Sequence, residues 1–183
     1  LYSGISATPP TIGFAAGQTE ALLDLAAFND TLDEPGEIFT LTVMNAAGTA
    51  RLGTSETIVI VGDDDAQPAF SVSDVSVAEG GLASFRVTLS APSGYTTGFS
   101  YSTADQSARL ADGDFIGGSG TVSFIPGQTE VQILAATNDD AESEGTENFR
   151  VLLSTPVNAT IADDTRTGTI LDTDAPPATR FRL

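Results

Sequence analysis

The chain of 183 residues is long enough for one large or two small domains, and its 40% hydrophobic residues are enough to build a core. Its 25 acidic residues outnumber 7 basic residues, and the formal net charge of −18 disfavours nucleic acid and anionic lipid as partners and favours cations. The chain has no Cys and no His, which excludes thiolate and imidazole metal sites, and with them zinc, iron and a Ser-His-Asp triad.

An internal repeat organises the chain. Residues 11–64 align without a gap to residues 121–174, and the run Thr11–Glu20 lies over Thr121–Glu130. Further identities place Asp30, Glu34, Glu37 and Phe39 over Asp140, Glu144, Glu147 and Phe149. Because the repeated unit is one domain long, it predicts a tandem array of domains and not a solenoid of short repeats.

The repeat also predicts the domain boundaries. Residues 1–65 match only the second half of the unit, and residues 66–175 form a complete one. Residues 176–183 resemble the start of the unit at Ala66–Val72, which predicts a linker and a possible first strand of a next unit. The chain is thus expected to be a processed product or a fragment, consisting of half a domain, one domain and a stub.

Within the complete unit apolar residues alternate with polar ones, as at Phe85, Val87 and Leu89, which is typical of strands with one face in a core. Strands are predicted at residues 70–72, 75–77, 85–89, 99–101, 122–124, 131–133, 149–153 and 167–171. Gly- and Pro-containing turns separate them. This pattern predicts an all-β fold, an antiparallel β-sandwich of about seven strands. Only Ala21–Ala27 is ambiguous between helix and strand, and its counterpart Val131–Thr137 has a strand pattern.

Carboxylates gather in the loops, above all in Asn138–Glu147. Like charges this close together require either full solvation or a bound cation. Loops cluster at the two ends of a sandwich, so loops far apart in sequence can supply oxygens to one ion. Calcium, which takes roughly six to eight oxygens from adaptable loops, fits this supply better than magnesium. The spacing of an EF-hand is missing, so the site is built from several loops or does not exist.

A family resemblance supports the metal interpretation. Residues 68–174 resemble a Calx-beta domain in these segments, in order: Phe70–Gly80, Phe85–Ser90, Tyr101–Asp105, Asp112–Phe115, Gly120–Gly127, Asp139–Asp140, Glu147–Phe149 and Ile170–Asp174. Calx-beta domains form the cytoplasmic calcium-sensing segment of sodium/calcium exchangers and occur in an integrin subunit and in many large bacterial surface and adhesion proteins. Residues 11–65 resemble the second half of such a domain.

The resemblance implies an immunoglobulin-like sandwich of seven strands, tandemly repeated, that binds Ca²⁺ at one end. Thr173 stands where the exchanger module has a third acidic residue, which implies one or two ions and not four. In residues 1–65 the acidic loop survives at Asn29–Glu37 without the partners equivalent to Glu79 and Asp114, so metal there should be weak or absent. The implied calcium ligands are Glu79, Asp114, Asp139, Asp140, Glu144, Glu147, Asp172 and Asp174.

Three functions compete. The favoured one is a calcium-binding structural or adhesive repeat module of a large secreted or cell-surface protein, with Ca²⁺ rigidifying the domain end and neighbouring domains or copies of itself as partners. The alternative is a self-assembling extracellular filament subunit, in which incomplete sandwich halves complement each other between chains. Regulatory calcium sensing ranks last, because the chain has no effector domain.

Catalysis is not expected. Gly117–Gly120 has neither the following Lys-Ser/Thr nor a helix, so it does not predict a phosphate-binding loop. Asp112 with Asp114, or Glu144 with Glu147, could imitate the carboxylate pair of a glycosidase, but the chain has no Trp to form a sugar platform. No run approaches the roughly 18 apolar residues of a membrane helix, so we predict no membrane insertion.

Overall fold

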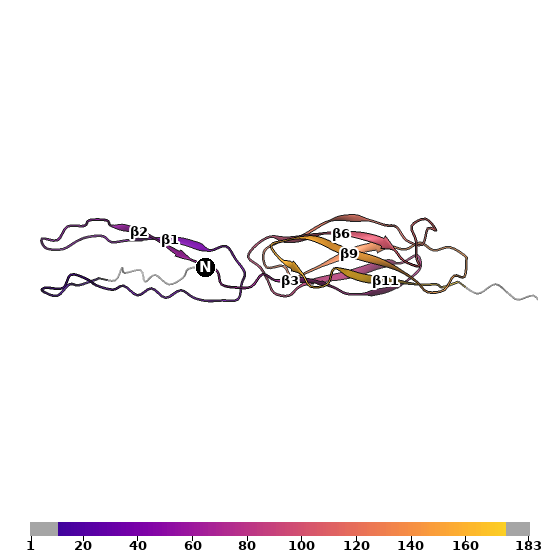
Figure 1. Ribbon diagram of the computed structural model, residues 1–183, viewed down its shortest axis with the longest axis horizontal. Helices are drawn as coiled ribbons and strands as arrows, with labels where there is room; N and C mark the ends of the chain where they lie inside the picture. The colour runs from indigo at the N-terminus through magenta and orange to yellow at the C-terminus, as the bar shows by residue number, and fades with distance from the viewer. Residues whose placement is uncertain (1–10, 175–183) are drawn as a thin grey trace, which may run out of the picture. The chain divides into compact units, whose positions relative to one another are not determined.

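The computed structural model describes residues 11–174 (Figure 1). The chain divides after Asp30 into two compact units, which are described separately. Residues 11–30 contain neither helix nor strand, and Leu22 in the ambiguous run is 85% exposed. The counterpart of this run forms a strand by pairing with residues 82–89, and residues 1–65 contain no counterpart of that partner. Without a neighbouring strand, the apolar alternation alone does not form a sheet.

The second unit begins with a small sheet of β1 (Glu37–Thr42) and β2 (Glu56–Val61), paired antiparallel. Its register is shifted by one residue from that of the aligned strands in the complete domain: Glu37 pairs with Val61, whereas Glu147 pairs with Ile170. A buried face is what fixes strand register. Ile170 is buried at 5% exposure, but its counterpart Ile60 is 71% exposed, so the two copies differ in pairing despite their sequence match.

The complete domain is a two-layer β-sandwich, which confirms the predicted fold class (Figure 1). One sheet has the order β10-β3-β5-β8 and the other the order β4-β11-β9-β6-β7. The strands are β3 (Ala69–Val72), β4 (Val75–Ala78), β5 (Leu82–Leu89), β6 (Thr97–Asp105), β7 (Ser119–Phe124), β8 (Glu130–Ala136), β9 (Glu147–Val157), β10 (Thr160–Ile161) and β11 (Thr165–Leu171).

Every strand predicted in this domain is present, and the structure adds details that the periodicity does not contain. The chain changes sheets between β3 and β4, because β3 pairs with β5 in one layer and β4 pairs with β11 in the other. The two-residue strand β10, which was not predicted, pairs in parallel with β3. The predicted linker and strand at residues 176–183 lie outside the described residues.

Alternation places the core between the two sheets. In β5 the side chains of Ala83, Phe85, Val87 and Leu89 are buried, and the residues between them are half-buried or exposed. Because successive side chains of a strand point to opposite faces, one period-two pattern gives both a core face and a solvent face. The described part of the chain contains no helix, and therefore none long and apolar enough to cross a membrane.

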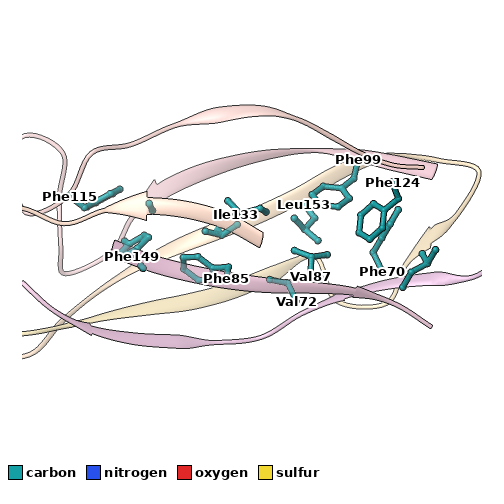
Figure 2. Packing of buried hydrophobic residues seen from close by; sticks show 14 of the residues in the cluster. Phe70, Val72, Phe85, Val87, Phe99, Phe115, Phe124, Ile133, Phe149 and Leu153 are labelled. Carbon is teal, nitrogen blue, oxygen red and sulfur yellow. The ribbon is translucent and has the colours of Figure 1, made fainter. Parts of the chain in front are cut away.

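Two groups of aromatic rings fill opposite ends of this core (Figure 2). At one end Phe115 stacks on Phe149 with ring centroids 4.5 Å apart, and Phe85 meets Phe149 edge-on at 5.8 Å. At the other end Phe70 contacts Phe99 at 4.9 Å and Phe124 at 5.3 Å. Phe115 directly follows Asp114, and Phe149 follows Glu147 by two residues. The first aromatic group thus anchors two of the predicted metal-binding segments to the core.

We expect Phe149→Ala to destabilise the chain by about 3–5 kcal/mol, because it empties a fully buried site and removes both ring contacts. Leu134→Ala is the matched control: Leu134 is 54% exposed, so its loss should change stability by no more than about 0.5 kcal/mol. Urea denaturation followed by circular dichroism measures both values. Equal effects of the two substitutions would contradict this assignment of the core.

Candidate metal centre

Strand register brings distant carboxylates to one end of the sandwich. β4 and β11 run in parallel with Ala78 opposite Leu171, so Glu79 and Asp172, the next residue of each strand, emerge side by side. β9 runs antiparallel to β11 and starts there, with Glu147 opposite Ile170. The loop between β8 and β9, which contains Glu144, therefore lies at the same end.

Two trios of carboxylates result. Glu79, Asp172 and Asp174 form the first trio, and Asp114, Glu144 and Glu147 form the second; within each trio, one carboxylate oxygen from every residue lies within 4.8 Å of the others. One cavity lies against both trios. It is lined by Glu79, Gly113, Asp114, Asn138, Asp140, Glu144, Gly145, Glu147, Ile170 and Asp172.

Asp172 ties the end of β11 to the acidic loop. Its Oδ2 accepts hydrogen bonds from the backbone N–H groups of Glu144 and Gly145, each at 3.0 Å, and from Ser143 Oγ at 3.3 Å. Its Oδ1 accepts a bond from the N–H of Asp174 at 2.8 Å. These bonds, led by those from Asp174 and Gly145, lower the pKa of Asp172. Gly145 has a φ of 101°, a left-handed conformation that suits glycine and turns its N–H toward the carboxylate.

Thr173 orients Glu79. Both the N–H and the hydroxyl of Thr173 donate to Glu79 Oε1, at 2.6 and 2.9 Å. Thr173 thus fixes a neighbouring carboxylate without adding a charge.

Asp174 has an unsatisfied oxygen. Its Oδ2 is buried and has no hydrogen-bond partner among the described residues. Burial, followed by the charges of Glu79 and Asp172, raises the pKa of Asp174. A buried acceptor of this kind is costly unless something compensates it, and a cation is the partner for which a carboxylate is best suited.

The second trio is the more strongly perturbed. The N–H of Arg109, in the same loop, donates a hydrogen bond to Asp114 Oδ2 at 2.7 Å. Burial, then a hydrogen bond with Asp114 and the charges of Asp114 and Glu144, raises the pKa of Glu147 to about 7. Burial and the charge of Asp140 raise the pKa of Glu144 in the same direction. Without a cation, the site therefore favours partial protonation of its carboxylates over full ionisation.

Two of the predicted ligands lie apart from the trios. Asp140 lines the cavity, and its Oδ1 accepts a bond from the N–H of Glu142 at 2.7 Å. Asp139 packs its side chain against Gly80 and is not among the residues that line the cavity. Strand register brings Glu79 next to Asp172 and Glu147 to the same end, whereas Asp139, next to Asp140 in sequence, does not line the cavity.

Asn138 connects the loops, a role that the sequence pattern did not assign. Its side-chain amide donates to the carbonyl of Gly113, its N–H donates to the carbonyl of Asp114 at 3.0 Å, and its carbonyl accepts from the N–H of Gly80 at 2.9 Å. The only sequence signal was its position immediately before the acidic run. Asn138 therefore sets the spacing of the turns that carry Glu79 and Asp114.

The donor set suits a hard divalent cation. Its side-chain oxygens come from carboxylates on several loops, and the orphaned oxygen of Asp174 and the raised pKa values indicate uncompensated negative charge at the same place. The profile of the Calx-beta domain matches residues 5–65 and again residues 62–174. The chain belongs to the Calx-beta domain family. Calx-beta domains are regulatory or structural calcium-binding modules.

One curated relative and two solved Calx structures are similar to the chain. The Adhesion G-protein coupled receptor V1 of Danio rerio is 32% identical over 161 residues, a match that covers 83% of this chain and 2% of the receptor. The chain therefore spans a very small part of that relative. The crystal structure of the apo form of the Calx CBD1 domain is similar with a TM-score of 0.54 and 25% identity, covering 60% of this chain and 100% of that one. The calcium-binding domain CBD12 of CALX1.1 gives a TM-score of 0.51 and 30% identity, covering 55% of this chain and 43% of that one.

The raised pKa of Glu147 predicts an unusual pH dependence. At pH values between its ordinary pKa of 4.5 and its raised pKa of about 7, Glu147 holds a proton in the folded chain but not in the unfolded chain. Stability falls with rising pH wherever the folded state binds more protons, so the metal-free domain should melt at a lower temperature at pH 7.5 than at pH 5. Thermal melts in EDTA across this range test the expectation.

Glu147→Gln provides the control, because its side chain stays neutral at every pH. The variant should lose much of the decline, and the part that remains belongs to Glu144 and Asp174, whose pKa values are raised as well. In calcium the trend should reverse, because Ca²⁺ needs the deprotonated carboxylates. A metal-free melting temperature that rises from pH 5 to pH 7.5 would contradict the assignment.

Proposed function

We propose that the complete domain, residues 66–175, binds Ca²⁺ at the end formed by β4, β9 and β11. The observation that carries the proposal is the buried, unpartnered Oδ2 of Asp174, which lies in a trio with Glu79 and Asp172. The second trio offers a second position, so one or two ions are expected. Calcium is preferred to magnesium because ligands from separate loops form an adaptable site. Asp140, which lines the cavity, is a further proposed ligand, and Asp139 adds negative charge near Asp174.

Calcium at this end acts as a structural element. The cation neutralises carboxylates that otherwise raise one another's pKa, as they do at Glu144 and Asp174. It joins loops that are already linked by the hydrogen bonds of Asp172. Because the ion binds the native arrangement and not the unfolded chain, it raises stability by linkage. The end of the domain becomes more rigid as a result.

The module serves as a repeat of a large secreted or cell-surface protein with a structural or adhesive role. The match to an adhesion receptor supports the surface location, and the tandem family match, together with the internal repeat, supports neighbouring Calx-beta domains as partners. Residues 1–65 then form the second half of one domain. Calcium binding there is expected to be weak, because this chain contains no counterpart of Glu79 or Asp114 in that half.

Calcium should raise the melting temperature of the chain relative to EDTA. At a free calcium concentration about 100-fold above Kd, one ion adds about 2.7 kcal/mol, which corresponds to a shift of roughly 10 °C. Asp114→Ala should remove the part of the shift that belongs to the second trio, because it removes one proposed ligand of that trio and the hydrogen-bond partner of Glu147. Differential scanning calorimetry with and without calcium measures the effect, and magnesium at the same concentration tests selectivity.

Glu130→Gln is the charge-matched control for Asp114→Ala. Glu130 lies on β8 and pairs with Arg86, away from both trios, so the variant should keep the full calcium shift. Isothermal titration of the parent should give one or two sites per chain. A melt of the parent that is insensitive to EDTA would contradict the proposal.

Self-assembly is a second candidate function, favoured by an exposed apolar face of the sheet that β1 and β2 form. Ile38, Ile58 and Ile60 lie on one face of this sheet and are 68%, 67% and 71% exposed. Neighbouring apolar side chains exposed on a small sheet are typical of surfaces that pair with another chain. Such pairing would let incomplete sandwich halves complement each other between chains.

Light scattering over a range of concentrations tests this candidate. Self-assembly predicts a mass that rises with concentration and a clear decrease in association for Ile60→Glu. Leu134→Glu is the control, because Leu134 is also exposed, at 54%, but lies on the complete sandwich. A monomer at all concentrations would leave calcium binding unaffected and rule out assembly.

A further inference from the structure

A second polar contact lies at the other end of the complete domain, between the turn after β5 and the acidic loop of the first copy. Within the unit that begins at Thr31, Asp33 forms an isolated parallel β-bridge with Ser93. Asp33 is 6% exposed and Ser93 1% exposed, although both are polar. Buried polar groups are rare without defined partners, so the contact is a specific feature of the fold.

The partners are well defined. The carbonyl of Asp33 accepts from the N–H of Gly94 at 2.9 Å and from Ser93 Oγ at 3.1 Å, and Asp33 Oδ2 lies 3.2 Å from the same hydroxyl. Ser93 Oγ accepts in turn from the N–H of Tyr95 at 3.1 Å. The carbonyl of Ser93 accepts from the N–H of Gly127 at 2.9 Å, which ties the turn to the connection between β7 and β8. Sixty residues of sequence separate Asp33 from Ser93, so this is a tertiary contact and not a local turn.

Gly94 is required by the closeness of the two segments. A Cβ added at Gly94 would lie 2.7 Å from the Cβ of Glu34 and 3.4 Å from its Cα. Atoms at that distance overlap, and the obstacle is the base of the side chain and not its flexible end. The backbone of Glu34 is fixed from its own side as well, since its N–H donates to Asp63 Oδ2 at 3.3 Å.

The contact is far from the metal centre. Ser93 precedes β6, whose first residues pair with the last residues of β9, whereas Asp105 at the end of β6 pairs with Phe149 near the start of β9. The metal centre surrounds the start of β9, so the Ser93 turn occupies the opposite end of the sandwich. Each end of the domain thus meets a different chemical environment.

We propose that the turn Pro92–Tyr95 is the receiving surface of a joint between repeats, and that its occupant is the acidic loop of the preceding Calx-beta repeat. In this chain the occupant is Asp33 with Glu34, which aligns with Glu144 of the metal centre. Asp33 aligns with Ser143, so its carboxylate belongs to the joint and not to a shared ligand set. The joint fixes successive repeats head to tail through backbone hydrogen bonds, a buried hydroxyl and a glycine.

Amide hydrogen exchange in the full chain tests the joint, with NMR detection of single residues. In the parent the N–H of Gly94 should be protected, because it donates to Asp33. Gly94→Ala should accelerate exchange at residue 94 by more than about tenfold, since the added Cβ forces Glu34 away and breaks the hydrogen bond to Asp33. Ser93→Ala should accelerate exchange at Gly94 by about fivefold, because it removes the hydroxyl that bonds Asp33.

Gly118→Ala is the matched control, because a Cβ there meets nothing within 4 Å and its φ is not in the left-handed region. It should leave protection of Gly94 at the parent level. Melting curves show whether each variant folds, and Ser93→Ala retains the test if Gly94→Ala does not. The measurements are made in EDTA and in calcium, so a failure of calcium binding would not obscure the result. Fast exchange at Gly94 in the parent, or equal protection in parent and Ser93→Ala, would overturn the joint.

Discussion

Repulsion among carboxylates at one end of the sandwich is the constraint on which the site depends. Burial and neighbouring negative charge raise the pKa of Glu147 to about 7, while a set of N–H donors lowers the pKa of Asp172. The fold can hold this arrangement because the segments beside it are anchored. Phe115 and Phe149 stack on each other close in sequence to Asp114 and Glu147 of the second trio, and β11, which leads to Asp172, lies between β4 and β9. The packed core therefore holds the carboxylates close together despite their repulsion. Protons or a cation reduce that repulsion.

Period-two alternation was sufficient to predict the sandwich, because burial of one strand face is a local property. Phe85, Val87 and Leu89 alternate in sequence and are all buried in the structure. The site was predictable only as a set of loops. Whether a carboxylate enters a trio depends on register: Glu79 meets Asp172 because Ala78 pairs with Leu171, whereas Asp139 packs on Gly80. The hydrogen bonds of Asn138 and Thr173 depend on the same pairing, and neither residue type predicts such a role by itself.

The two copies of the repeat show how far a sequence match determines structure. Ile60 and Ile170 align, but one is exposed and the other buried, and the strands that carry them pair one residue out of step. In the second copy an opposing sheet packs against the strands, and its side chains require one register. The aligned strands β1 and β2 pair in a different register. Asp33 and Ser143 differ in the same way: they align, yet Asp33 is buried against Ser93 and Ser143 donates to Asp172.

A domain with a different chemistry at each end gives an array a direction. In the proposed array, two contacts order the acidic loop of a repeat. One is with a cation within its own domain, and the other is with the serine turn of the domain that follows. Each event removes conformational freedom that the other would otherwise have to remove, so the two should favour each other. Linkage makes this coupling reciprocal: a formed joint raises the affinity of the loop for calcium by the factor by which calcium strengthens the joint.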